Sequence, residues 1–340
     1  MKQDIKNLTL NELKAAVTVM GEPAHRAQQI FSWLYGKNAE SFGMMTNLPR
    51  RFISRLEKKF TVAHLECEKR LRAKDGTEKF LWRLEDGKHV ETVLIKHGKR
   101  RTLCLSTQVG CRFRCPFCAS GAMGFSRNLT VSEIVGQLLS AQKLTAERVT
   151  NVVFMGIGEP LDNYDNLVRS IFIINSPQGP AIGARRITVS TCGIIPGILK
   201  LKDIGLQVEL AVSLHAADNE LRNEIVPINR KYPLKKLIDA CKEYHKKTKR
   251  IITIEYTLIS GKNDSTGNAD KLARIAHEIN AKVNLIACNP SDSAASAAPD
   301  KDALRPFASR LRSKKVTVTC RKPRGDDIFA ACGQLAGRQS

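Results

Sequence analysis

From Thr102 onwards, short β-prone runs alternate with amphipathic stretches of helical length, and this alternation restricts the possible folds more than any other feature. The expected strands are 103–106, 152–155, 187–190, 208–214, 251–258 and 283–287. The expected helices are 130–143, 163–174, 196–203, 233–247, 266–279 and 302–313. Such alternation predicts an α/β fold with a parallel sheet or barrel. In these folds the ligand site lies at the C-terminal ends of the strands.

Polar, cysteine-bearing or glycine-rich residues follow most of the expected strands. These residues are 111–118, 156–159, 190–193, 213–215 and Asn289. Because the ends of parallel strands meet at one edge of a sheet, we predict that the chemistry of this protein lies on one rim.

The first hundred residues have a different pattern. Thr9 and Glu12 have capping-box spacing, and Pro49 suits the first turn of a later helix. Asp-Gly pairs at 75–76 and 86–87, and the pair His97-Gly98, separate β-prone runs as hairpin turns do. We therefore predict four parts: a helical accessory domain over 1–60, a β-hairpin extension over 61–101, the α/β core over 102–320 and a C-terminal segment over 321–340.

Charge and cysteine content narrow the function. The chain has 340 residues and a formal net charge of +22, which indicates either a solvated surface or a polyanionic partner such as nucleic acid. The N-terminus lacks a signal-peptide pattern, and no apolar run approaches the roughly 20 residues of a membrane span. We expect a cytoplasmic protein, in which clustered cysteines indicate metal binding or catalysis.

Three of the ten cysteines form a C-x₃-C-x₂-C motif, Cys111, Cys115 and Cys118. Three thiolates so close together can bind three irons of a 4Fe–4S cluster and leave the fourth iron open to a small substrate. A zinc site would need a fourth ligand, for which His215 or Cys104 could serve without a standard zinc spacing. Inert buried thiols are a further alternative. We favour the iron–sulfur cluster.

The motif, with Phe117 inside it, resembles the signature of the radical S-adenosylmethionine (SAM) enzymes. The resemblance implies a partial (βα)₆ barrel. It also implies that the open iron chelates the amino and carboxylate groups of SAM, and that one electron then cleaves SAM to a 5′-deoxyadenosyl radical.

Further motifs bring the resemblance to one family. In order, they are Val90-Glu91-Thr92-Val93, Cys104 with 108–111, FMGIGEP at 154–160, Ser190-Thr191-Cys192-Gly193, Ser213-Leu214-His215, VPIN at 226–229, and Gly325-Asp326-Asp327 leading to ACGQL at 331–335. Together they resemble the RlmN/Cfr family of RNA adenine methyltransferases, and its RlmN branch in particular. The Pro after Glu159 favours that branch over the Cfr type, which methylates carbon 8.

The resemblance implies a reaction that consumes two SAM molecules per turnover. Cys332 takes a methyl group from the first, and the radical from the second removes a hydrogen from that methyl. The methylene radical adds to carbon 2 of an adenine, with Glu91 as the implied proton acceptor. Cys104 then attacks the sulfur of Cys332, which forms a transient disulfide and releases the methylated RNA.

The same resemblance assigns cofactor contacts and partners. The implied SAM contacts are Gly158, Glu159, Ser190, Ser213, Leu214, His215 and Asn289. The implied substrates are 23S rRNA near the peptidyl-transferase centre and the adenosine 3′ of the anticodon in tRNA. We expect a monomer that receives electrons from a low-potential donor such as a flavodoxin. A non-catalytic zinc RNA-binding protein is the alternative from another class.

Some residues depart from the family pattern or receive no role. Phe329 stands where the family usually has Asp, Ala287-Cys288 replaces an aromatic or Pro-containing pair, and 291–300 is rich in Ala and Ser. These departures concern the contacts with RNA rather than the chemistry. We expect the remaining cysteines to pack in the interior; they are Cys67, Cys192, Cys241, Cys288 and Cys320.

Overall fold

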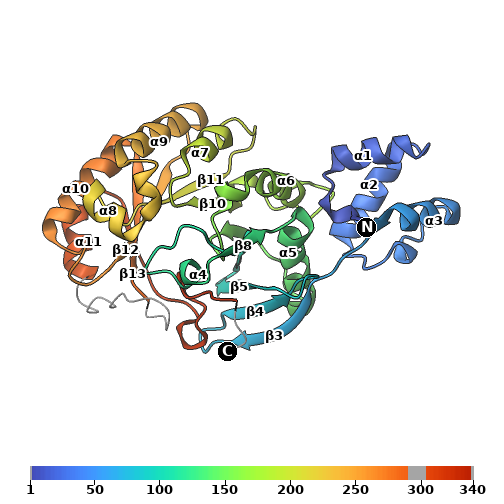
Figure 1. Cartoon of the computed structure of the whole chain (residues 1–340), viewed down its shortest axis with the longest axis horizontal. Helices are drawn as coiled ribbons and strands as arrows, with labels where there is room; N and C mark the ends of the chain where they lie inside the picture. The colour runs from blue at the N-terminus through green and yellow to red at the C-terminus, as the bar shows by residue number, and fades with distance from the viewer. Residues whose placement is uncertain (1, 290–303, 338–340) are drawn as a thin grey trace.

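One continuous sheet organises the computed structural model, which describes residues 2–289 and 304–337. Seven neighbouring strands of this sheet run parallel: β6 (Arg100–Cys104), β9 (Asn151–Phe154), β10 (Ile187–Thr191), β11 (Glu209–Ser213), β12 (Ile252–Leu258), β13 (Ala281–Ala287) and β14 (Val318–Arg321). Helices cover their outer side (Figure 1): α5 (Val131–Thr145), α6 (Tyr164–Asn175), α7 (Ile195–Leu201), α8 (Asn219–Ile225), α9 (Leu234–Thr248), α10 (Thr266–Glu278) and α11 (Leu304–Ser313). The predicted α/β alternation is confirmed.

The sequence missed several short elements. Strand β14 adds a seventh parallel strand at the edge, and α8 follows β11. The loop after β6 holds a two-stranded sheet, β7 (Gln108–Gly110) with β8 (Phe125–Asn128), and the one-turn helix α4 (Ala119–Ala122). Elements of three to seven residues show too little periodicity to be recognised from their sequence.

Side chains along each parallel strand alternate between the helical layer and the interior of the barrel. In β12, Ile252, Ile254, Tyr256 and Leu258 are all fully buried and belong to the main core cluster with residues of the surrounding helices. The intervening side chains point the other way, and those near the end of the strand are polar. The interior of the barrel is therefore polar at its C-terminal end.

The predicted hairpins form, and they pair with the sheet of the barrel. Strands β3 (Glu66–Arg72), β4 (Glu78–Arg83) and β5 (His89–His97) are antiparallel and continue the barrel sheet beyond β6. Strand β3 begins at Glu66, after the short strand β2 (Phe60–Thr61) has ended. The sheet thus changes from parallel to antiparallel between β6 and β5, which places the hairpins beside the barrel.

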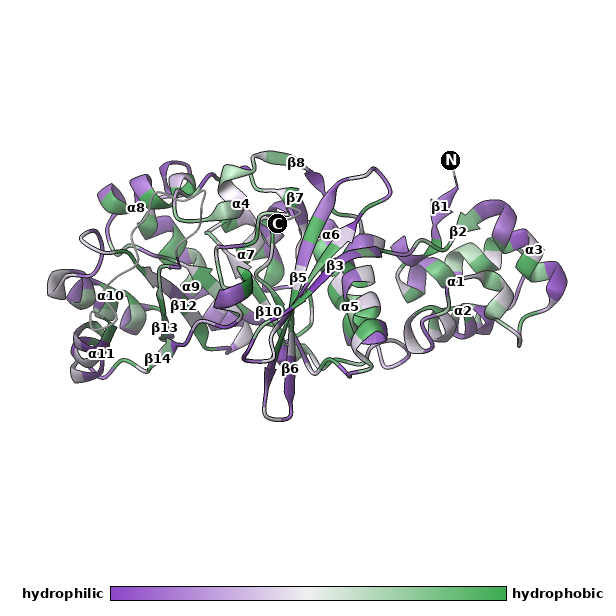
Figure 2. Cartoon of the chain, turned by 90° about the horizontal axis from the view of Figure 1, so that it is seen from below, coloured by the Kyte–Doolittle hydropathy of each residue, from purple (hydrophilic) through white to green (hydrophobic). Residues whose placement is uncertain are grey.

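The N-terminal helices form a unit to one side of the barrel (Figures 1 and 2). The unit contains α1 (Leu10–Val19), α2 (His25–Phe31) and α3 (Arg50–Lys59), and α1 has the predicted capping box of Thr9 and Glu12. Strand β1 (Gln3–Asp4) pairs with β2 (Phe60–Thr61), which joins the two ends of the unit. Asn7 connects it to the barrel by accepting a hydrogen bond from the Ser132 amide at 2.9 Å. Within the described residues no helix is long and apolar enough to cross a membrane.

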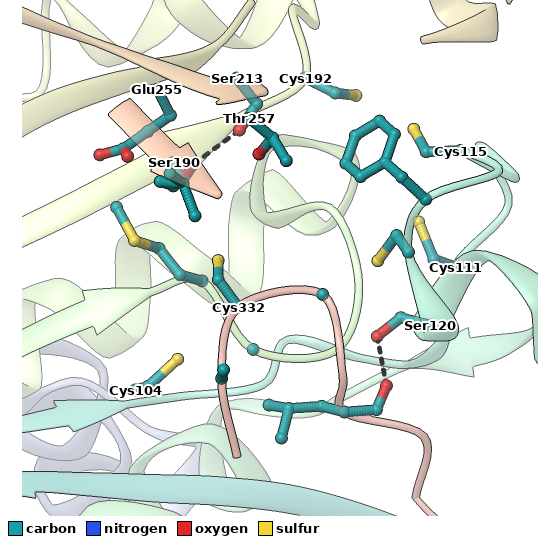
Figure 3. A pocket seen from close by; sticks show the side chains of 18 of the residues that line it. Cys104, Cys111, Cys115, Ser120, Ser190, Cys192, Ser213, Glu255, Thr257 and Cys332 are labelled. Carbon is teal, nitrogen blue, oxygen red and sulfur yellow. Dashed lines mark hydrogen bonds between the residues drawn. The ribbon is translucent and has the colours of Figure 1, made fainter. Parts of the chain in front are cut away.

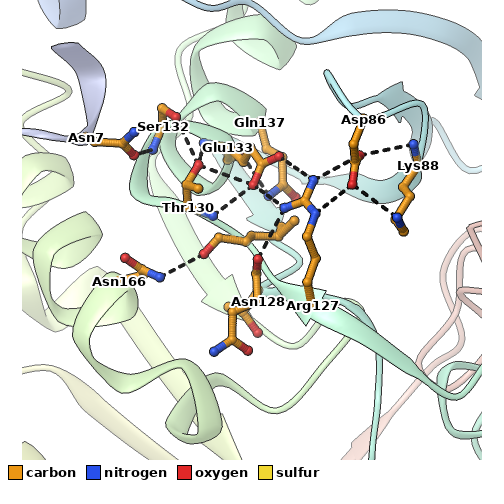
Figure 4. Close-up of polar contacts among 12 residues, drawn as sticks. Asn7, Asp86, Lys88, Arg127, Asn128, Thr130, Ser132, Glu133, Gln137 and Asn166 are labelled. Atoms are coloured by element: carbon orange, nitrogen blue, oxygen red, sulfur yellow. Dashed lines mark hydrogen bonds and ion pairs between the residues drawn. The ribbon is translucent and has the colours of Figure 1, made fainter. Parts of the chain in front are cut away.

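Arg127 of β8 holds three segments together near the cysteine loop (Figure 4). Its guanidinium donates to Asp86, in the turn between β4 and β5, at 2.8 and 3.0 Å. It also donates to Glu133, in the first turn of α5, at 2.8 and 2.9 Å. These bonds to Arg127 hold the pKa of Asp86 well below its usual range. Paired fork geometry of this kind fixes orientation as well as distance.

Gln137 connects α5 to the end of β6. Its fully buried amide accepts from the Ser106 amide at 2.9 Å and donates to the Ser106 carbonyl at 2.9 Å. The Thr92 hydroxyl donates to Gln137 at 2.8 Å and accepts from Trp82 at 2.9 Å. Ser106 lies just after β6, where the chain begins the cysteine loop, so this network sets the starting point of that loop.

We predict that Gln137→Leu lowers the free energy of unfolding by about 2–4 kcal/mol, because several buried polar groups lose their partners. Urea unfolding followed by circular dichroism measures the change. Gln207→Leu is the control: Gln207 is exposed and contacts Arg185, so a change below about 0.5 kcal/mol is expected. Equal effects of the two substitutions would contradict the role of the network.

Candidate active site

A cavity of about 170 Å³ opens at the C-terminal ends of the parallel strands. Strands β6 and β9 to β13, the cysteine loop and the C-terminal segment all contribute side chains to its wall (Figure 3). This is the rim on which the sequence places the chemistry.

The three motif cysteines line one part of this cavity. Cys111 directly follows β7. The Cys118 amide donates to the Cys115 carbonyl at 3.0 Å, and this turn directs the thiols of Cys115 and Cys118 to the same cavity. Burial raises the pKa of the Cys111 thiol to about 12 and raises that of Cys115, and the neighbouring thiols add to both shifts. Thiolates in this place therefore require positive charge beside them, which bound iron supplies.

The chemistry of the donor set fits an iron–sulfur cluster. Cys111, Cys115 and Cys118 lie on one loop and all line the cavity. Three thiolates can bind three irons of a 4Fe–4S cluster and leave the fourth iron without a protein ligand.

The loop after β9 approaches the cysteine loop so closely that glycine is required. Gly158 has a φ of +97°, and a Cβ there would lie 2.4 Å from the Cβ of Gln108. Gln108 accepts a hydrogen bond from the Glu159 amide at 2.9 Å. The Glu159 carboxylate accepts from the amides of Cys192 at 2.8 Å and Leu161 at 3.0 Å, and burial raises the pKa of this carboxyl.

Ser190 and Ser213 stand at the ends of β10 and β11, with their hydroxyl oxygens 3.4 Å apart at the edge of the cavity (Figure 3). Leu214, which the family resemblance places among the SAM contacts, does not line the cavity. Its amide donates to the Glu255 carbonyl at 3.0 Å, and its carbonyl accepts from Arg222 at 3.1 Å. Leu214 therefore joins strand ends rather than facing the cavity.

His215 enters the cavity from a strained backbone position, with a φ of +57°. Its Nδ1 accepts a hydrogen bond from the Thr257 amide at 3.0 Å, and its ring meets the edge of Phe117 with centroids 4.8 Å apart. Burial, with a further contribution from Arg222, lowers the pKa of His215 to about 3. The imidazole is therefore neutral near pH 7, and Nε2 carries its proton.

Arg222 is a residue that the sequence did not reveal. It is fully buried and donates to the Cys192 carbonyl at 2.7 Å and to the Asn229 side chain at 2.9 Å, as well as to Leu214. It thereby fastens the ends of β10 and β11 to each other. The VPIN motif that ends in Asn229 was the available signal, but the helix carrying Arg222 was not expected.

The C-terminal segment folds back into the cavity and carries Cys332 there. The Asn289 amide donates to the Cys332 carbonyl at 3.1 Å, the Ala119 amide donates to Gly333 at 2.7 Å, and Ser120 donates to Leu335 at 2.8 Å. Cys332 and Cys104 both line the cavity (Figure 3). Residues 228 positions apart in sequence thus meet at one site.

Both thiols are hard to ionise. Burial raises the pKa of Cys104 to about 12. Cys332 is exposed to the solvent of the cavity, but the protein that surrounds it raises the pKa of its thiol, and Arg321 opposes that shift. Arg321 is therefore the positive group that favours a thiolate at Cys332.

Arg321 and Glu255 are further cavity residues that the sequence reading missed. Arg321 is the last residue of β14, and Glu255 lies within β12. The side-chain amide of Asn284 donates a hydrogen bond to the Glu255 carboxylate at 2.8 Å. The signal for Glu255 was its position among alternating apolar residues of β12, which directs it into the barrel. Cys192 and Cys288 pack in a small apolar cluster, as expected, but they also line the cavity.

Glu91 lies outside the wall of the cavity. Its carboxylate is buried, pairs with Lys79 at 3.0 Å and accepts the amides of Ala336 at 2.7 Å and Gly337 at 2.9 Å. Phe329 is exposed and has a φ of +51°, a conformation that Asp tolerates better than Phe. The expected loop over 291–300 lies outside the described residues.

Comparison with known proteins agrees with this site. Residues 105–273 match the radical SAM superfamily, and residues 3–62 match the N-terminal domain of the ribosomal RNA large subunit methyltransferases. A radical SAM methyltransferase from Sphaerobacter thermophilus, solved by crystallography, superposes with a TM-score of 0.93 at 42% identity, covering 99% of this chain and 100% of that one.

Two curated relatives are similar over nearly their whole length. The dual-specificity RNA methyltransferase RlmN of Geotalea uraniireducens is 47% identical over 337 residues, covering 99% of this chain and 97% of the relative. The dual-specificity RNA methyltransferase RlmN of Geobacter sulfurreducens is 44% identical over 335 residues, covering 98% of this chain and 92% of the relative. At this identity and coverage, the chain belongs to the RlmN family of radical SAM RNA methyltransferases.

Proposed function

We propose that this protein methylates carbon 2 of a specific adenosine in 23S rRNA and of the adenosine 3′ of the anticodon in tRNA. The observation that carries the proposal is that Cys332 and Cys104 meet in the cavity lined by the C-x₃-C-x₂-C cysteines. An adenine ring carbon is too weak a nucleophile to take a methyl group directly from SAM. A thiol that carries the methyl group beside a radical-generating centre overcomes that limit.

When bound, a 4Fe–4S cluster and SAM supply the methyl group and the radical chemistry, with two SAM molecules used per turnover. Cys111, Cys115 and Cys118 hold the cluster in this proposal. The SAM contacts are Gly158, Glu159, Ser190, Ser213, His215 and Asn289. Of these, His215 offers an N–H donor from a neutral ring, and Glu159 offers a carboxylate that is held in place by the amides of Cys192 and Leu161.

Cys332 acts as the methyl carrier. The Cys332 thiol first loses its proton, and its sulfur then forms a bond to the methyl carbon of SAM as the bond from that carbon to the sulfonium sulfur breaks, which leaves S-adenosylhomocysteine as the neutral leaving group. Arg321 stabilises that thiolate from the wall of the cavity. After the methylene has joined the adenine, Cys104 attacks the sulfur of Cys332. An S–S bond forms as the S–C bond to the RNA product breaks, and the product carbon takes up a proton.

The charge of the chain supports RNA as the substrate. The net charge is +22, and α3 turns Arg50, Arg51, Lys58 and Lys59 to solvent while Phe52 and Leu56 face the core. We assign residues 1–60 to RNA binding on this basis. The protein then works as a monomer in the cytoplasm, with electrons from a low-potential donor of the flavodoxin type.

The product of the reaction tests the proposal directly. Loss of the gene should remove 2-methyladenosine from 23S rRNA and from tRNA, as measured by mass spectrometry of digested RNA. Expression of the gene should restore both. Loss of 8-methyladenosine instead would assign a Cfr-type reaction, and no change in either nucleoside would contradict the assignment.

We predict that Cys111→Ser abolishes iron binding by anaerobically purified protein. The thiolate ligands of an iron–sulfur cluster give broad visible absorbance, and this absorbance and the iron content should both fall to background. Cys320→Ser is the control, because Cys320 is exposed and lies outside the cavity. A colourless wild-type protein loaded with zinc would contradict the cluster.

We predict that Cys104→Ala traps RNA on Cys332, as a covalent complex seen on denaturing gels. In the wild type the release step should accelerate about tenfold per pH unit near neutral pH, because only the thiolate attacks and the pKa of Cys104 is about 12. Single-turnover quenching at several pH values measures this step. Release of free methylated RNA by Cys104→Ala at the wild-type rate would exclude the role of Cys104.

A further inference from the structure

One buried ion pair contacts the segment that carries Cys332 on both sides of that cysteine. Lys79 of β4 and Glu91 of β5 pair at 3.0 Å, with side chains only 7% and 3% exposed. Lys79 also donates to the carbonyl of Phe329, at 3.3 Å. Glu91 accepts the amides of Ala336 and Gly337 on its other oxygen. The pair thus contacts the chain both before and after Cys332.

The strand register places the two side chains where they can act together. Leu81 of β4 is the partner of Glu91, and Lys79 lies two positions further along β4, opposite Val93. Positions two apart share a face of a sheet, so Lys79 and Glu91 lie on the same side. That side faces the C-terminal segment. The antiparallel hairpins beside the barrel therefore provide a rigid support for residues 329–337.

The cysteine loop and the barrel also contact the segment. Ala119 and Ser120 bind Gly333 and Leu335, and Asn289 binds Cys332 itself. Of the bonds described here, those to Lys79 and Glu91 are charge-assisted, and such bonds are roughly twice as strong as neutral ones. Removal of one partner would also leave the other charge buried and unpaired.

We propose that Lys79 is a positioning residue for the methyl-accepting thiol. Together with Glu91 it clamps residues 329–337, which sets the position of Cys332 relative to Cys104 and the cysteine loop. The inference rests on the proposed function for the meaning of Cys332. The clamp itself is a property of the fold and can be measured without RNA.

The clamp also changes the reading of Glu91. While its carboxylate holds Lys79 and two amides, it does not face the cavity. In this structure both oxygens of the Glu91 carboxylate are therefore occupied in holding the C-terminal segment and its lysine partner.

Hydrogen exchange of the anaerobically purified holoenzyme tests the clamp. In Lys79→Met, peptides that cover 329–337 should exchange about tenfold faster or more, as expected when a charge-assisted bond is lost. Glu91→Gln keeps the shape of the side chain but removes its charge, and should accelerate the same peptides. Lys79→Arg keeps the charge and should restore most of the protection.

Kinetics separate positioning from general stability. Lys79→Met should lower kcat for RNA methylation and leave KM for RNA unchanged, with Lys79→Arg close to the wild type. Lys96→Met is the matched control: Lys96 lies in β5 and pairs with Glu78 at 2.7 Å, away from the C-terminal segment. It should change neither the exchange of 329–337 nor kcat.

Three outcomes would overturn the proposal: unchanged exchange in Lys79→Met, equal loss of kcat in Lys96→Met, or failure of Lys79→Arg to restore protection. If Lys79→Met does not fold, the comparison of Glu91→Gln with the wild type decides in the same way. Altered exchange with no methylated RNA from the wild type would uphold the clamp and reject the proposed function instead.

Discussion

The parallel alignment of β6 and β9 to β14 is the constraint on which the rest of the structure depends. Strands that run in one direction end at one edge, so loops from distant parts of the sequence must meet there. Alternation of side chains then sends apolar residues to the helices and polar ones into the barrel. Arg222 fixes this arrangement by binding backbone carbonyls from the ends of two neighbouring strands. The rim is thus the place where the chain converges, and it carries polar side chains from several strand ends.

The thiols at the rim need a positively charged partner before they can ionise. Burial disfavours thiolates at Cys104, Cys111 and Cys115. Ionisation at such positions depends on a partner: bound iron for the motif cysteines, and Arg321 for Cys332. The neutral His215 adds a donor without adding charge. These thiols therefore react as thiolates only when their positive partners are beside them.

The antiparallel hairpins beside the barrel support the C-terminal segment that carries Cys332. A C-terminal segment without regular secondary structure has little rigidity of its own, and hydrogen bonds to loops alone leave it mobile. Anchoring to a sheet through the Lys79–Glu91 pair gives it a fixed support on both sides of Cys332. The N-terminal unit is also joined to the helices of the barrel: Asn7 accepts from the Ser132 amide, and Arg169 of α6 donates to the Asn7 carbonyl and to Glu12. The basic residues of α3 face solvent.

The sequence by itself determined the α/β class, the capping box of α1, the hairpin turns and the cysteine motif, because each depends on residues close together along the chain. With the family resemblance, it also singled out Cys104 and Cys332. Only the tertiary structure decided that Leu214 and Glu91 lie outside the cavity and that Arg321, Glu255 and Arg222 belong to the site or its support. These roles depend on contacts between residues far apart in sequence, and on which face of a short strand or helix a side chain occupies. A local pattern does not contain that information.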